Sequence, residues 1–140
     1  MKLLLNLWIL LFCFSCNLAR LSNKSSDYLN LQGIWLAETE SQNGIKKNVA
    51  FQYNFSGNLL VFTDETGQTV KYNFELGKIK NLKVINIIPE GSPKDSKPVS
   101  VGYELKSNLL KIVVAPPGLI PLDISDKNEQ ELIISRRKKL

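Results

Sequence analysis

Carboxylates are the main side chains in this 140-residue sequence that could do acid–base chemistry, because the chain has no histidine and only two cysteines. The lack of histidine excludes histidine-dependent triads, histidine general bases and imidazole metal sites. The acidic residues that lie close together in the sequence are Glu38 with Glu40, Asp123 with Asp126, and Glu129 with Glu131. Paired carboxylates can act on sugars, but a polar strand face, shared by Glu38 and Glu40, or a polar loop explains each pair more simply. We therefore expect a non-enzymatic protein with no catalytic residue, no cofactor and no metal.

Six aromatic residues form the second group of candidates, because alternation places them on the inward faces of predicted strands. They are Phe51, Tyr53, Phe55, Tyr72, Phe74 and Tyr103. Together with Trp35 they could line a cavity for a small apolar ligand, since an eight-stranded barrel can leave room for one small molecule. Large apolar residues on a buried face are more often packed core. We therefore favour a packed core over a ligand cavity, and both interpretations remain open.

The elements that must position these residues are short strands, because apolar and polar residues alternate from residue 31 onward. The pattern predicts strands at 31–40, 49–55, 59–63, 70–76, 82–88, 99–105, 109–114 and 132–136. Tight turns join most of them, and no long segment has helical periodicity. An antiparallel up-and-down barrel of eight strands over residues 31–140 is therefore the expected fold, since closure leaves no exposed edge. A β-sandwich is the alternative.

The connection at 115–130 is long for a hairpin. Leu122 and Ile124 alternate with polar residues, so the segment could hold a short edge strand. It could instead form a rim over the open end of the barrel.

Residues 1–15 have the pattern of a secretory signal peptide. Lys2 is followed by an apolar run, residues 3–14, that is interrupted only by Asn6. A helix through this run would be about 18 Å long, too short for a hydrocarbon core of about 30 Å. We therefore expect the segment to be cleaved rather than kept as a membrane span.

The segment 13–16, Cys-Phe-Ser-Cys, resembles a bacterial lipoprotein signal, in which a small residue precedes a cysteine that is acylated before cleavage. The resemblance implies that acyl chains on Cys16 bind the membrane, and that the protein lies in the bacterial cell envelope, facing the periplasm or the cell surface. Residues 16–30 are polar and aperiodic, as expected of a flexible tether. The alternative is ordinary cleavage near Ser15 or Ala19, which would leave a soluble exported protein.

Five segments together resemble the small lipocalin-like domain of uncharacterised exported bacterial proteins. They are Leu31-Gln32-Gly33-Ile34-Trp35, residues 102–105, residues 109–112, Ala115-Pro116-Pro117-Gly118 and residues 132–137. The resemblance implies a small up-and-down barrel whose closed end is crossed by Trp35, after Gly33, and covered by an arginine of the last strand. That arginine is Arg136 if it lies on the same side of the strand as Leu132 and Ile134. It is Arg137 if the chain follows the family's ending, in which three apolar residues and one variable residue precede Lys-Arg.

The formal charge of +5 is a mild excess spread along the chain, and no RNA-binding pattern accompanies it, so we expect no nucleic-acid partner. The basic run at 136–139 is interpreted as the polar end of the last strand. The sequence thus predicts a membrane-anchored lipoprotein with a barrel that could bind a small apolar ligand. The alternative is a protein-interaction or structural envelope module with a fully packed barrel.

Overall fold

The computed structural model describes residues 25–139. The predicted signal peptide, the predicted lipid attachment at Cys16 and most of the predicted tether lie outside the described residues. The described elements are α3 (Ser26–Leu31), β1 (Gly33–Gln42), β2 (Ile45–Asn48), β3 (Gln52–Ser56), β4 (Leu59–Thr63), β5 (Thr69–Ile79), β6 (Leu82–Pro89), β7 (Val99–Lys106), β8 (Leu109–Val114) and β9 (Glu131–Arg137).

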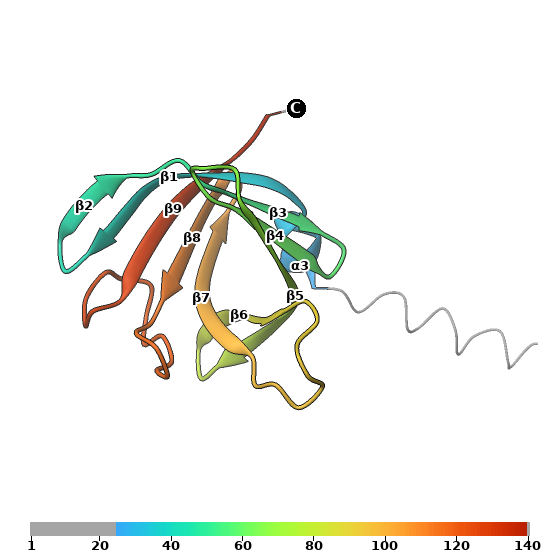
Figure 1. Ribbon diagram of the computed structural model, residues 1–140. Helices are drawn as coiled ribbons and strands as arrows, with labels where there is room; N and C mark the ends of the chain where they lie inside the picture. The colour runs from blue at the N-terminus through green and yellow to red at the C-terminus, as the bar shows by residue number, and fades with distance from the viewer. Residues whose placement is uncertain (1–24, 140) are drawn as a thin grey trace, which may run out of the picture. The chain divides into compact units, whose positions relative to one another are not determined.

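The strands from β1 to β9, without β2, close into an antiparallel barrel (Figure 1). Each strand pairs with the next in the order β1, β3, β4, β5, β6, β7, β8 and β9, and β9 pairs back onto β1. Every pairing is antiparallel, so the chain runs up and down around the barrel. This confirms the predicted all-β fold with an eight-stranded up-and-down barrel.

Strand β2, which was not predicted, forms a hairpin with the second half of β1. Residues 33–36 of β1 pair with β3, whereas residues 39–42 pair with β2. The turn between β1 and β2 is Asn43-Gly44, both with positive φ, at 50° and 80°. Asn-Gly is a strong hairpin signal, but all four residues of β2 are exposed, so no hydrophobic alternation marked the strand. The hairpin projects at the left of Figure 1.

Side chains alternate between the barrel interior and its outer face, as the period of a strand requires. The interior holds large residues that are at most 2% exposed, among them Trp35, Phe55, Phe74, Ile85 and Leu110. These residues come from five different strands. Their burial supplies the main driving force for closing the barrel.

The connection at 115–130 does not form an edge strand. Its residues Pro121 and Ile124 also do not lie over the barrel end but pack on the outside of β7. Residues 115–130 contain no strand. A Cβ added to Gly102 would lie 3.4 Å from Pro121 and 3.5 Å from Ile124. Gly102 points outward because its neighbours Val101 and Tyr103 are buried on the inner side of β7. This connection therefore covers the outer face, which explains why the outward-facing Val84 is only 1% exposed.

The interval predicted as a tether contains the short helix α3. Ser25 caps this helix, because its Oγ accepts a hydrogen bond from the backbone N of Tyr28 at 3.3 Å. Asp27 lies in the first turn, where a negative charge is favourable. A six-residue helix is too short to leave a periodic pattern in the sequence, which is why the sequence analysis assigned a spacer.

Candidate functional site

The closed end of the barrel is organised around Trp35, which has no solvent contact. Its Nε1 donates a hydrogen bond to the carbonyl of Leu31 at 2.8 Å. The guanidinium carbon of Arg137 lies 4.3 Å from the centroid of the indole ring, in cation–π geometry. Arg137 Nη1 also donates a hydrogen bond to the carbonyl of Gln32 at 2.6 Å. The chain entering β1 is thus tied to the end of β9.

Gly33 is required at this end by both its backbone and its surroundings. Its φ of +113° lies in a region that residues with a Cβ rarely adopt. A Cβ at this position would also lie 3.2 Å from Arg137 Nη1. The glycine therefore leaves room for the arginine that covers Trp35.

Of the two arginines left open by the sequence, the structure places Arg137 over the indole and Arg136 on the outer face. Ile133 and Ser135 are buried on the inner side of β9, and Arg137 continues that parity. Arg136 Nε instead donates to Glu38 Oε2 at 3.0 Å, in an exposed ion pair. The alternative that placed Arg136 over Trp35 assumed that Leu132 and Ile134 face the interior. It was wrong because the inner side of β9 carries Ile133 and the polar residue Ser135.

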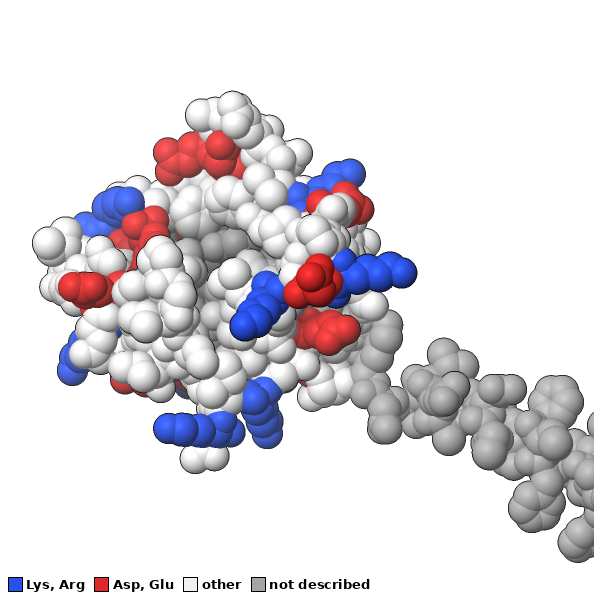
Figure 2. Space-filling model, turned by 60° about the horizontal axis from the view of Figure 1, so that its bottom comes forward, with Lys and Arg blue, Asp and Glu red and all other residues white. Residues whose placement is uncertain are grey.

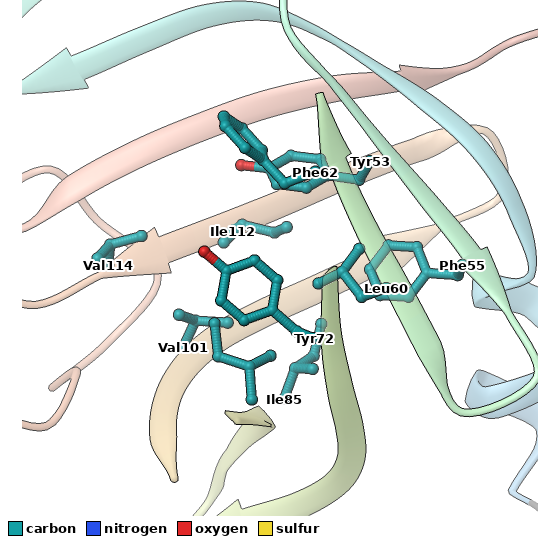
Figure 3. A pocket seen from close by; sticks show the side chains of 10 residues that line it. Tyr53, Phe55, Leu60, Phe62, Tyr72, Ile85, Val101, Ile112 and Val114 are labelled. Carbon is teal, nitrogen blue, oxygen red and sulfur yellow. The ribbon is translucent and has the colours of Figure 1, made fainter. Parts of the chain in front are cut away.

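The barrel interior is not completely filled. A cavity of about 170 Å³ lies between the strands (Figure 3). Its walls are apolar apart from two phenolic hydroxyls. The lining residues are Tyr53, Phe55, Leu60, Phe62, Tyr72, Ile85, Ile87, Val101, Ile112 and Val114. An apolar cavity of about 150 Å³ in another protein binds benzene, so this cavity has room for one ring or a short alkyl chain.

Three of the six aromatic residues proposed as ligand-lining contribute to this cavity: Tyr53, Phe55 and Tyr72. The other three are packed elsewhere. The ring centroid of Phe51 lies 5.3 Å from that of Phe62, and the centroid of Phe74 lies 5.2 Å from that of Phe55. Tyr103 is buried in the core at 4% exposure.

The remaining lining residues are mainly Leu, Ile and Val, which were not among the candidates named from the sequence. Phe62 was also missed, although the alternation of Leu60 and Phe62 in β4 would have identified it as inward-facing. The aliphatic residues carry no signal that separates a cavity wall from a filled core.

Tyr53 places a buried hydroxyl in this cavity. Burial, and then the nearby charges of Glu131 and Glu40, raise the pKa of Tyr53 well above its usual value of 10.0, so the hydroxyl stays protonated. Among residues 25–139, no hydrogen bond is found for this hydroxyl or for that of Tyr72. In Figure 3 both phenolic oxygens point into the space between the labelled side chains. A ligand in the cavity could hydrogen-bond to either hydroxyl.

The carboxylates Glu38 and Glu40 do not share one face of β1, contrary to the sequence analysis. The pairing of β1 with β9 shifts by one residue between Ala37 and Thr39, which is a β-bulge. Before the bulge, the inward-facing Ala37 pairs with Ser135, and after it Glu40 pairs with the inward-facing Ile133. Glu40 is therefore turned inward, whereas Glu38 points outward to Arg136.

Glu40 meets Glu131, a carboxyl from the first residue of β9. Burial, a hydrogen bond with Glu40 and the charge of Glu40 raise the pKa of Glu131 to about 7, while Lys47 opposes the shift. Partial burial acts to raise the pKa of Glu40, but hydrogen bonds with Lys47 and Glu131 outweigh it, so that pKa is below 4.5. Lys47 Nζ lies 2.7 Å from Glu40 Oε1. Near neutral pH, a protonated Glu131 can thus donate a hydrogen bond to an ionised Glu40.

The other acidic pairs organise loops. Asp126 Oδ2 accepts a hydrogen bond from the backbone N of Gly44 at 3.0 Å. Asp123 Oδ1 accepts from Gln130 Nε2 at 3.0 Å, and Gln130 Oε1 accepts from the backbone N of Leu122 at 2.6 Å. Gln130 is 1% exposed, so it anchors the connection before β9 from inside.

Between residues 25 and 139, no three His, Cys, Asp or Glu side chains cluster as metal ligands would. No helix in the same range is sufficiently long and apolar to cross a bilayer.

Positive and negative side chains are interspersed on the face seen in Figure 2, and neither sign forms a continuous patch there.

Comparisons of this chain with protein-family models, with curated proteins and with solved structures found no match.

Proposed function

We propose that this protein is a lipocalin-like binding module whose barrel takes up a small apolar ligand, or the apolar part of a larger one. The observation that carries the proposal is the cavity of about 170 Å³, with apolar walls and the unbonded hydroxyls of Tyr53 and Tyr72. Such a combination of apolar surface and a few polar groups is typical of small-molecule sites. The fold supports the comparison with lipocalins only at the level of an eight-stranded barrel.

The test is calorimetric titration of the full chain with straight-chain alcohols from butanol to decanol. We expect affinity to rise with chain length until the alkyl chain exceeds the cavity, and then to level off. Val101→Phe should abolish binding because Val101 lines the cavity. Val99→Phe is the matched control, since it makes the same change on the same strand at a side chain that is 56% exposed.

A melting curve for each variant separates loss of the cavity from loss of the fold. If Val101→Phe is too unstable, Val114→Phe, at the half-buried end of β8, offers a second way to fill the cavity. Equal binding by Val101→Phe, Val114→Phe and the unmodified chain would rule out the cavity as the site.

We also propose that acyl chains on Cys16 anchor the protein to a membrane of the bacterial cell envelope. The support is the leader at residues 1–15 with its Ser15-Cys16 junction. Cys16→Ala should release the protein from the membrane fraction, and mass measurement should show an unmodified N-terminus. Unchanged membrane association together with an unacylated N-terminus in the unmodified protein would contradict the anchor.

We propose a binding role rather than a catalytic one for the carboxyls. Glu40 and Glu131 hydrogen-bond to each other, whereas the two carboxyls of most glycosidases stand about 5 to 9.5 Å apart on either side of the substrate. Glu38 is paired with Arg136 and Glu104 with Lys111, both on the outer face. None of these pairs holds two carboxyls on opposite sides of the cavity.

Protein interaction is a second candidate function, favoured by three exposed apolar residues in the connection before β9. Leu119, Ile120 and Leu122 are 65%, 54% and 71% exposed. Clustered apolar exposure of this kind often marks an interaction surface. A second copy of the chain is the first partner to test. Sedimentation should detect self-association that Leu122→Asp abolishes, and a strictly monomeric protein would argue against this candidate.

A further inference from the structure

The carboxyls of Glu40 and Glu131 lie next to the cavity, at the end where β8 finishes and β9 begins. Glu131 pairs in register with Val114, which lines the cavity. The electrostatic effect of both carboxyls reaches the hydroxyl of Tyr53, another lining residue. The two carboxyls therefore lie just beyond the apolar lining at one end of the cavity, on the side of Val114 and near the Tyr53 phenol.

We infer that Glu40 and Glu131 form a head-group site for this cavity and select ligands in which a protonated amine is joined to an apolar body. This inference rests on the proposed binding function, since it assigns the chemical class of the ligand. The apolar body would occupy the cavity, and the ammonium group would lie between the two carboxyls.

The geometry favours a cation over an anion. One basic side chain, Lys47, contacts the pair, and it lies 2.7 Å from Glu40 with 65% of its side chain exposed. No Lys or Arg of the described region lies within ion-pair distance of Glu131. An anionic head group would bring a third negative charge next to the pair, whereas an ammonium group would give Glu131 a partner.

The hydroxyl of Tyr53 is the independent indication that a ligand belongs here. Tyr53 is only 8% exposed, and its hydroxyl makes no hydrogen bond within residues 25–139. An amine donates its protons, and the phenolic oxygen can accept one. Of the groups near the pair on neighbouring strands, Tyr53 offers an acceptor, while Val114 is apolar.

The charge state of Glu131 links amine binding to pH. Its pKa of about 7 means that it shares a proton with Glu40 near neutrality. A bound ammonium group replaces that proton, so binding releases a proton and strengthens as pH rises. Lys47 stays charged because hydrogen bonding to Glu40 raises its pKa, and Tyr53 stays neutral. Between pH 6 and pH 8 we expect the affinity for an amine to rise about tenfold, in proportion to ionised Glu131.

The experiment compares hexylamine, hexan-1-ol and hexanoate, which share one alkyl chain and differ in head group. Each is titrated calorimetrically into the full chain at pH 6 and pH 8, and the amine is also titrated in buffers of different ionisation enthalpy. At pH 8 we expect hexylamine to bind at least about tenfold more tightly than hexan-1-ol, and hexanoate to bind more weakly than both. The amine titration near pH 7 should release protons to the buffer.

Glu131→Gln should reduce the affinity for hexylamine at pH 8 about tenfold and leave hexan-1-ol binding unchanged. Glu40→Gln tests the second carboxyl in the same way. Glu38→Gln is the matched control, because Glu38 is on the same strand as Glu40 but points outward. That control should leave the binding of all three probes unchanged.

The outcomes separate this inference from the proposed function. If hexylamine and hexan-1-ol bind equally well, or if Glu131→Gln retains the full preference for the amine, the head-group site is wrong while apolar binding stands. If none of the three probes binds at pH 6 or pH 8, the proposed function and the inference are both overturned.

Discussion

At the scale of single residues, Trp35 has the largest structural role. Its ring is fully buried, and its one polar atom is bonded to the carbonyl of Leu31. Trp35→Ala should lower the free energy of unfolding by about 3 to 5 kcal/mol, because it leaves a cavity and an unpaired carbonyl. Urea denaturation measures the change. Leu36→Ala, at a side chain that is 39% exposed on the same strand, should change it by less than about 1 kcal/mol. An unchanged midpoint for Trp35→Ala would contradict the role of the indole.

Arg136 and Arg137 provide a matched comparison of adjacent arginines. Arg137→Gln should destabilise the protein by about 1 to 3 kcal/mol, because it removes the cation–π contact with Trp35 and the hydrogen bond to Gln32. Arg136→Gln breaks only an exposed ion pair with Glu38 and should cost less than about 1 kcal/mol. Chemical denaturation of the two variants gives both values. Equal losses would mean that the two arginines have equivalent roles.

At the scale of elements, the bulge in β1 decides which carboxyl faces the cavity. A shift of one residue reverses the side of the sheet on which every later side chain lies. Without the bulge between Ala37 and Thr39, Glu40 would point outward and Glu131 would lack its partner. The sequence carries no signal for this bulge, since the residues around it are an ordinary mixture of small and polar types.

The connection at 115–130 depends on one buried glutamine. Gln130→Ala removes hydrogen bonds to the backbone of Leu122 and to Asp123, so it should cost about 1 to 3 kcal/mol and loosen the connection. Hydrogen exchange at the Leu122 amide should accelerate more than exchange in the barrel strands. Gln42→Ala is the control. Gln42 is exposed, and its side chain donates a hydrogen bond to the carbonyl of Glu129 in the same connection. Equal exchange rates at Leu122 in both variants would contradict the anchoring role of Gln130.

At the scale of the whole molecule, Glu131 makes stability depend on pH. Its pKa rises from 4.5 to about 7 on folding, so the folded state binds the proton more tightly than the unfolded state. The contribution is complete below pH 4.5 and is lost as pH rises through 7. Glu131→Gln should therefore stabilise the protein at pH 8 relative to the unmodified chain. We expect about 1 kcal/mol, because solvent screens this half-buried group.

Thermal melts at pH 5 and pH 8 test this dependence. Glu131→Gln should reduce the loss of stability between the two values, although Glu40, whose pKa is lowered, contributes in the opposite direction near pH 4.5. Glu129→Gln, at an exposed position nearby, should follow the unmodified chain. An identical pH dependence for all three proteins would contradict the raised pKa.

Alternation with a period of two predicted the barrel strands from the sequence, because it is a local property that each strand carries in its own residues. The sequence also identified Gly33 and Trp35, and it assigned six of the eight barrel strands within two residues of their observed ends; β3 begins at Gln52 rather than at residue 49, and β5 ends at Ile79 rather than at residue 76. Tertiary structure alone decided that Arg137 covers Trp35, since the polar Ser135 occupies an inner position that an apolar pattern cannot reveal. It also decided that a cavity remains and that Glu40 meets Glu131. Both depend on how side chains from several strands meet after a bulge has changed the register, which no single stretch of sequence encodes.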